Sequence, residues 1–318
     1  MIPFTVLSQV RFPYAGAWKR VDSLSGLGQP RSAIGLVEKI HSAALKEKND
    51  PQIIRSVIYT IRLNADFQEN FFPRTIDYLK KEIAGVTVPG KQVLISVLAE
   101  VYWKFYQNNQ YRFQGRTSLG NITPDSIETW DLSAIMNAVI TTYLSSLENE
   151  YLLKSIPLKN YAAILESSPF DKKRSVPAPD LRPTLFDFLA HRALDFFANS
   201  EGQKIQPVSA FQINNAIFFD QADQFSKIVI RSADSLSVKL ISLHIFQRLA
   251  MFHIADKNPA AMVSLELERF DYLRNNAIVP GKDSLYRQAL ETLHSGYASS
   301  PASTEVLYAL ASFLYDRG

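Results

Sequence analysis

Hydrophobic residues recur every three to four positions through most of the chain, which is the spacing of amphipathic helices. The segment after Pro30 shows this pattern, and the segment after Asp50 and Pro51 repeats it. We expect Asp50 to cap the second helix and Pro51 to occupy its first turn. The apolar positions are Ile34, Val37, Ile40, Ala44 and Leu45 in the first helix, and Ile53, Ile54, Val57, Ile58 and Ile61 in the second.

Most of the remaining chain has the same period. Asp131 is placed to cap a helix that begins at Leu132. The other predicted helices are 73–84, 91–107, 184–198, 235–255, 259–275, 284–297 and 303–315. The segment 236–254 is apolar nearly all round, so we expect other elements to cover it on several sides. Short β-branched or aromatic runs at 204–219 and 227–230 allow at most one short β excursion. The pattern therefore predicts an all-α protein.

Long helices joined by short turns favour antiparallel pairs stacked on one another. Leu310, Ala311, Leu314 and Gly318 have the spacing of the first helix of a tetratricopeptide (TPR) repeat. Partial matches begin at Leu98 and at Leu249, but not at a 34-residue period. We therefore predict a degenerate TPR-like α–α superhelix, with a compact irregular helical domain as the alternative.

A proline-rich stretch interrupts the helical pattern at 167–183. Its four prolines exclude a helix, and its basic run at 172–174 predicts an exposed loop that trypsin cuts readily. This stretch divides the chain into a helical subdomain at 1–166, the loop at 167–183, and a TPR-like helical subdomain at 184–318. A second long connection is predicted at 112–129.

Composition excludes several classes of chemistry. The 318 residues contain no cysteine, which excludes thiol nucleophiles, thiolate metal sites and disulfides. The net charge of +3 gives no general reason to expect nucleic acid or acidic lipid as a partner. No window approaches the length of a membrane span, and residues 1–10 lack the basic and apolar regions of a secretory signal. A lipidation cysteine is also absent from this segment.

The helix at 184–198 carries the most suggestive polar residues, because Asp187, His191 and Asp195 recur every fourth position. They could form a metal or general-base cluster. However, eight residues span about 12 Å of helix axis, too far for both aspartates to bind one ion with His191. We favour a polar stripe with an Asp–His pair at i,i+4, opposite the apolar face of the same helix.

The other histidines give no clear indication of a catalytic or metal site. His244 and His253 lie two and a half turns apart on one helix, so we expect them on opposite sides, packed or satisfied at the edge of the core. His41 and His294 have no evident partner nearby in the sequence. No HExxH, GxSxG, P-loop or GxGxxG motif occurs. We therefore predict no catalytic residue, no cofactor and no metal; an enzyme would need a cleft that gathers Asp187, His191 or another histidine with a carboxylate.

Aromatic residues are densest at 102–113, where Lys104 and Arg112 are interleaved among them. Such a mixture can stack the bases of single-stranded nucleic acid. The alternative is a helix end whose rings wedge between neighbouring helices, and the small net charge favours it. We predict no nucleic-acid partner. The aromatic residues are Tyr102, Trp103, Phe105, Tyr106, Tyr111 and Phe113.

Several stretches in order carry a family resemblance. They are WKRVDSL at 18–24, GQPRSA at 28–33, VIY at 57–59, LAEVYWKFYQNN at 98–109, WDL at 130–132, YLSSLE at 143–148 and RPTLFDFLAHRALD at 182–195. Together they resemble the amino-terminal helical region of very large alpha-2-macroglobulin-like proteins from Bacteroidota. The last stretch is the most specific, and the likeness weakens beyond it.

The resemblance implies a fragment of a periplasmic or cell-envelope protein whose family traps proteases. Family members use a cleaved bait segment and, in many cases, a thioester built from cysteine and glutamine. Without cysteine this segment cannot form the thioester, and its pattern lacks the family's run of β-sandwich domains. We therefore expect a non-catalytic docking module for a protein or peptide. The alternative is a stand-alone helical-repeat scaffold, or an uptake lipoprotein that binds protein or carbohydrate.

Overall fold

The computed structural model describes residues 11–65, 67–113, 126–165, 180–198 and 211–316. Over these ranges the protein is all-α, which confirms the predicted fold class. The β structure within them is an isolated bridge between Pro157 and Thr184. The described parts of 204–219 and 227–230 form a short 3-10 helix and irregular chain, so the permitted β excursion does not occur there. None of the described helices has the length and apolarity needed to cross a membrane.

The chain folds into two compact units. Unit 1 contains Met1–Val139 and Asn160–Glu166, and unit 2 contains Ile140–Lys159 and Ser167–Gly318. The predicted division differs, because it assigned 140–159 to the first half. These residues pack within unit 2, where the ring of Tyr143 stacks on that of Phe196 with centroids 5.2 Å apart. Most of the predicted proline-rich loop and of the connection at 112–129 lies outside the described residues.

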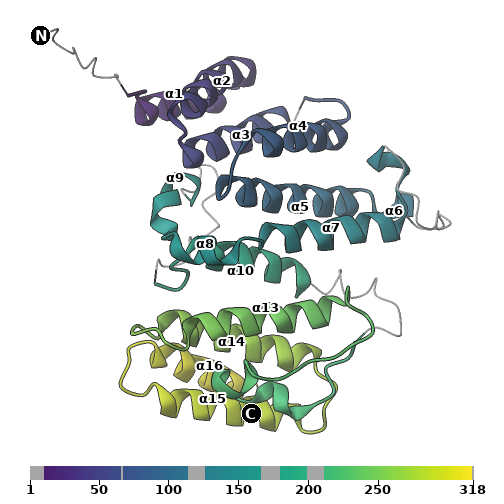
Figure 1. Cartoon of the computed structure of the whole chain (residues 1–318), viewed down its shortest axis with the longest axis vertical. Coiled ribbons are helices and arrows are strands. Elements are labelled where there is room, and N and C mark those ends of the chain that lie inside the picture. Colours follow the sequence, from purple (N-terminus) through teal and green to yellow (C-terminus); the bar gives the residue numbers. More distant parts are fainter. Residues whose placement is uncertain (1–10, 66, 114–125, 166–179, 199–210, 317–318) are drawn as a thin grey trace, which may run out of the picture. The chain divides into compact units, whose positions relative to one another are not determined.

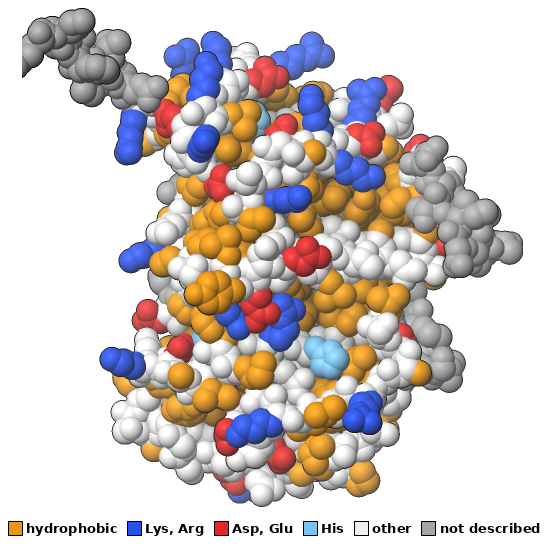
Figure 2. Space-filling view, in the orientation of Figure 1, with side chains coloured by type: hydrophobic (Ala, Val, Ile, Leu, Met, Phe, Trp, Pro, Cys, Tyr) orange, Lys and Arg blue, Asp and Glu red, His pale blue; other side chains and the backbone are white. Residues whose placement is uncertain are grey.

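Unit 1 is built from consecutive helices that pack as neighbours (Figure 1). Helix α2 packs against both α1 and α3, and α5 packs against both α3 and α4. Figure 2 shows Lys and Arg side chains gathered over α1 and α2. The elements are α1 (Tyr14–Gly26), α2 (Pro30–Glu47), α3 (Asp50–Asn64), α4 (Phe71–Gly85), α5 (Gly90–Asn108), α6 (Gln110–Phe113), η1 (Ile127–Thr129), the first half of α7 (Leu132–Ser146) and α9 (Ala162–Leu165).

The core of the first three helices centres on Trp18. Its indole Nε1 donates to Oε1 of Gln52 at 2.7 Å, and the guanidinium of Arg55 lies 4.5 Å from its ring. Arg55 also lies over the ring of Tyr59, whose hydroxyl donates to Asp22. The WKRVDSL stretch thus supplies two side chains, Trp18 and Asp22, that hold α1 on α3.

The two predicted aspartate caps have different outcomes. Asp131 accepts a hydrogen bond from the backbone N–H of Ala134 at 2.7 Å, so the predicted cap of α7 is confirmed. The prediction for Asp50 is wrong: it is the first residue of α3, and its carboxylate accepts the N–H of Gly90 at the start of α5. A Cβ on Gly90 would lie 2.9 Å from Cγ of Asp50, so only glycine allows this approach.

Unit 2 is organised around α13, which packs against α10, α12 and α14. Its buried residues cover most of its circumference and leave one exposed side at His244 and Met251, so other elements cover it on several sides, as the sequence predicted for 236–254. Helices α14, α15 and α16 pack on one another. The elements are α8 (Glu150–Ser155), α10 (Leu185–Phe197), η3 (Ala216–Phe219), α12 (Ala222–Phe225), α13 (Val238–His253), α14 (Ala260–Asn276), α15 (Lys282–Gly296) and α16 (Ser303–Tyr315); η2 (Leu158–Tyr161) lies at the boundary between the units.

Candidate functional site

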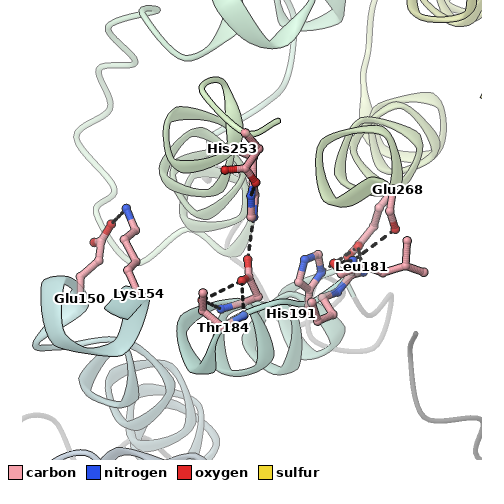
Figure 3. A network of polar contacts seen from close by, with 11 residues as sticks. Glu150, Lys154, Leu181, Thr184, His191, His253 and Glu268 are labelled. Atoms are coloured by element: carbon pink, nitrogen blue, oxygen red, sulfur yellow. Dashed lines mark hydrogen bonds and ion pairs between the residues drawn. The ribbon is translucent and has the colours of Figure 1, made fainter. Parts of the chain in front are cut away.

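Polar side chains of α10 contact both α13 and α14 (Figure 3). Asp187 makes the contact with α13, and His191 makes the contact with α14. Asp187 also takes part in a capping box. The backbone N–H of Asp187 donates to Oγ1 of Thr184 at 3.3 Å, and the backbone N–H of Thr184 donates to Oδ2 of Asp187 at 2.9 Å. This reciprocal pair satisfies backbone donors at the start of α10 and fixes the rotamer of the Asp187 carboxylate. The side chain is thereby aimed at α13.

The second oxygen of Asp187 binds His253 on α13. Nε2 of His253 lies 2.7 Å from Oδ1 of Asp187, and Nδ1 lies 2.7 Å from Oδ2 of Asp256. Both ring nitrogens therefore face carboxylates. Since a carboxylate only accepts hydrogen bonds, both nitrogens must carry a proton, and this geometry selects the imidazolium form.

In the Asp187–His253 pair, burial and the neighbouring charges shift the pKa values in opposite directions. Burial alone lowers the pKa of His253, but the hydrogen bonds and charges of Asp187 and Asp256 outweigh it, and the pKa is raised. Burial likewise raises the pKa of Asp187, but His253 and Thr184 outweigh it, and the pKa is lowered. Each partner thus favours the charged form of the other.

His191 belongs to a second group, between α10 and α14. Its Nδ1 lies 2.9 Å from Oε2 of Glu268, and the guanidinium of Arg182 lies 3.1 Å from the same oxygen. Burial raises the pKa of Glu268, but its cationic neighbours His191 and Arg182 outweigh burial and lower it. Figure 3 shows His191 and Glu268 turned toward each other from the two helices.

The predicted residues of α10 therefore separate. The predicted Asp–His pair at i,i+4 does not form between Asp187 and His191, because Asp187 binds His253 on α13 and His191 faces Glu268 on α14. Asp195 lies exposed on the same helix. Across the described ranges, no three His, Asp or Glu side chains gather so as to hold a metal ion.

The remaining histidines have different surroundings. His253 and His244 lie on opposite sides of α13, as their spacing predicted, and His253 is buried and satisfied. His244 is exposed, so the expectation that it packs at the edge of the core is wrong. His41 gains partners that the sequence did not reveal: Nδ1 lies 2.8 Å from Oγ of Ser56, and Nε2 lies 3.3 Å from Glu82. His294 is half-buried on α15.

Sequence reasoning missed the buried ion pair of α14. Nε of Arg269 donates to Oε1 of Glu266 at 2.8 Å, and the two side chains are fully buried. The guanidinium also donates to the carbonyl oxygens of Phe218 and Asp220. It lies 4.1 Å from the ring of Phe225. The one available signal was the i,i+3 spacing of the two opposite charges, on a helix that also carries Glu268, Asp271 and Arg274.

A further ionic group lies between α8 and α13. Glu150 accepts from Nε of Arg248 at 2.8 Å and lies 2.5 Å from Nζ of Lys154. The ammonium of Lys154 sits 4.9 Å from the ring of Phe186 and 4.7 Å from that of Phe252. Glu150, Arg248 and the two rings thus anchor α8 on the rest of unit 2.

The aromatic stretch at 102–113 packs as the favoured interpretation predicted. Tyr102, Trp103, Phe105 and Phe113 are buried. The ring of Tyr102 lies 5.7 Å from that of Trp130, and the ring of Phe105 lies 5.6 Å from that of Phe72. Tyr111 is exposed, so the four buried rings, and not the whole stretch, serve the core of unit 1.

The outer faces of α15 and α16 differ in polarity. The exposed residues of α15 are polar: Ser284, Arg287, Gln288, Glu291, Thr292 and Ser295. Helix α16 buries Val306 and Phe313 against its neighbours. Its exposed side carries four large apolar residues beside Thr304, Glu305 and Ser312, with 48% of Leu307, 73% of Tyr308, 50% of Leu314 and 87% of Tyr315 exposed. Between Val306 and Tyr315 this helix carries no charged residue.

The described polar groups thus serve to hold elements of the fold together. The ring nitrogens of His253, the guanidinium of Arg269 and the carboxylate of Glu268 each tie two or more elements together. No family model, curated protein or solved structure matches the chain.

Proposed function

We propose that the chain is a non-catalytic helical docking module that binds a protein or peptide. The observation that carries this proposal is the apolar outer face of α16, defined by Leu307, Tyr308, Leu314 and Tyr315. Single exposed apolar residues are common on proteins, but four large ones on one helix, in a stretch from Val306 to Tyr315 without charge, mark an interaction site. The polar outer face of α15 shows how a helix of the same unit looks when it faces solvent.

The partner of this face is an apolar helix or strand from a protein. Aromatic side chains such as Tyr308 and Tyr315 contribute large contact areas and keep a hydroxyl at the wet rim of an interface. Helices at the end of a stacked array have polar outer faces unless a further element covers them. An apolar face on α16 is therefore suited to receive another helix, supplied by a second protein or by a further part of the same polypeptide.

Site-specific photo-cross-linking tests this proposal directly. A photoreactive phenylalanine analogue at Tyr308 should form a discrete adduct in envelope extract, whereas the same analogue at Gln288 on α15 should not. Leu314→Glu should abolish the adduct at position 308, because it places a charge in the contact. Equal labelling from 308 and 288, or only background from both, would refute a docking role for α16.

We also propose that this module forms the amino-terminal helical region of a large cell-envelope protein of the alpha-2-macroglobulin-like kind. The ordered stretches from WKRVDSL to RPTLFDFLAHRALD support this assignment. Two of those stretches supply residues that join helices within a single unit, Trp18 within unit 1 and Asp187 within unit 2. Cell fractionation should place the native gene product in the envelope, and its reading frame should continue for many hundreds of codons past Gly318. A stop codon there would contradict this assignment without touching the docking role of α16.

A further inference from the structure

Helices α1 and α2 carry an excess of cations that the fold does not use. Six side chains are exposed and have no hydrogen-bond or ion-pair partner among the residues that the structure describes. We call them the α1–α2 basic surface. They are Lys19, Arg20, Arg31, Lys39, Lys46 and Lys48. Figure 2 shows Lys and Arg side chains gathered over these helices, with few acidic ones between them.

The acidic residues of the same segment are largely engaged inside unit 1. Asp22 accepts the hydroxyl of Tyr59 at 2.9 Å, and Glu47 accepts the hydroxyl of Tyr14 at 2.9 Å. Residues 11–48 contain seven Lys and Arg against three Asp and Glu, whereas residues 282–316 contain two against four. The small net charge of the chain therefore conceals a basic segment, which attracts an anionic partner.

The chemistry of the two helices narrows the class of that partner. Most of their large apolar residues, including Trp18, Val37 and Ile40, point into the core. The exposed Leu27 and Leu45 do not form a broad apolar face. Membrane-surface helices instead present a broad apolar face to lipid. Single-stranded nucleic acid requires exposed rings for stacking. Here Trp18 is buried, and Tyr14 is half-buried with its hydroxyl on Glu47. A basic surface with two scattered exposed leucines and no exposed ring fits an acidic segment of a protein best.

We infer that the α1–α2 basic surface binds a segment of a partner protein rich in Asp and Glu. The inference rests on the proposed docking function and adds the chemistry of a partner. It concerns unit 1 alone and uses none of the residues of α16. The two surfaces can therefore be tested independently.

Fluorescein-labelled poly-L-glutamate is a suitable probe, with binding followed by fluorescence anisotropy of the full chain. We expect binding at about 50 mM NaCl that weakens strongly by about 300 mM, since exposed charges are screened by salt. The variant Lys39→Glu with Lys46→Glu should lose about tenfold in affinity, because it reverses two charges of the surface. The matched control is Arg231→Glu with Lys257→Glu, which reverses two exposed cations of unit 2 and should lose less than about twofold.

Three results would overturn the inference. The first is no binding of poly-L-glutamate at low salt, and the second is an equal loss in the test and control variants. The third is preferential binding to anionic phosphatidylserine vesicles that the Lys39 and Lys46 changes abolish, which would assign the surface to membranes. The photo-adduct at Tyr308 should be unchanged in the Lys39→Glu, Lys46→Glu protein. If this adduct persists while poly-L-glutamate binding fails, the result refutes the inference about the α1–α2 basic surface and leaves the docking role of α16 untouched.

Discussion

Nε2 of His253 lies 2.7 Å from Oδ1 of Asp187, although 66 positions separate the two residues in the chain. Both side chains are buried, and Asp187 also belongs to the capping box of α10. One carboxylate thus stabilises the start of one helix and fixes the packing of another.

Removal of either partner should destabilise unit 2. We expect His253→Ala to lower the free energy of unfolding by about 3 to 5 kcal/mol, because it leaves the buried Asp187 carboxylate without its cation. Urea unfolding followed by circular dichroism measures the change. His244→Ala, on the exposed side of the same helix, is the control and should change stability by less than about 0.5 kcal/mol. Similar losses in both variants would contradict the importance of the pair.

The same pair predicts how stability varies with pH. The pKa of His253 is raised in the folded protein, so its contribution is complete below the unfolded value of about 6.5 and is lost as the pH rises through the folded pKa. The pKa of Asp187 is lowered, so its contribution is present above the unfolded value of about 3.9 and is lost as the pH falls through the folded pKa. Stability should therefore decline on both sides of a window between these limits.

Unfolding titrations from acidic to alkaline pH test this expectation. In His253→Gln the decline above about pH 6.5 should flatten, because the titrating group is gone. The His244→Gln protein should keep the wild-type decline above about pH 6.5, because burial lowers the pKa of His244 and its effect on stability lies below that value. An unchanged alkaline decline in His253→Gln would assign the pH dependence to another group.

Two glycine substitutions should act in opposite directions. Gly90→Ala places a Cβ 2.9 Å from Cγ of Asp50, which displaces the carboxylate and should cost about 1 to 3 kcal/mol. Gly35→Ala, within α2, meets no atom within 4 Å and should stabilise by up to about 1 kcal/mol through its higher helix propensity. Thermal unfolding of the two variants under identical conditions measures both signs. A stabilised Gly90→Ala protein would show that the contact with Asp50 is dispensable.

The buried Arg269–Glu266 pair should show strong coupling. Arg269→Met leaves Glu266 without its cation and should cost about 3 to 5 kcal/mol, whereas Arg269→Met combined with Glu266→Leu should recover much of that loss. A double-mutant cycle by chemical denaturation measures the coupling. Arg287→Met, which breaks an exposed pair with Glu291, should cost at most about 1 kcal/mol. If the double variant is no more stable than Arg269→Met, the pair is not coupled in this way.

The sequence predicts the features that depend on neighbours in the chain. Helical periodicity is local, and so is the cap by Asp131, whose partner lies three residues away. The position of Asp50 looked equally local, but its partner, Gly90, is 40 residues away, and only tertiary packing could bring it there. The TPR-like form of the helix stacking stays a prediction.

The candidate site follows the same rule. Spacing on one helix correctly separated His244 from His253, because helix geometry alone decides that relation. It could not identify Asp187 as a partner of His253, since the choice between Asp187 and Asp195 depends on how α10 lies on α13. The burial of Arg269 was missed for a similar reason: two of its acceptors are main-chain carbonyls of a distant segment, which leave no trace in a sequence pattern.

The attachments of the segment around η3 and α12 have a consequence for synthesis. Phe218 and Asp220 are held by Arg269, Phe225 is held by Gln247, and Gln221 reaches Ala289, so each anchor lies later in the chain. A polypeptide emerging from the ribosome exposes this segment before any of those anchors exists. The phenylalanines of this segment therefore stay exposed until α13 to α15 have been synthesised. We expect chaperones to bind a nascent chain that is stalled before Arg269.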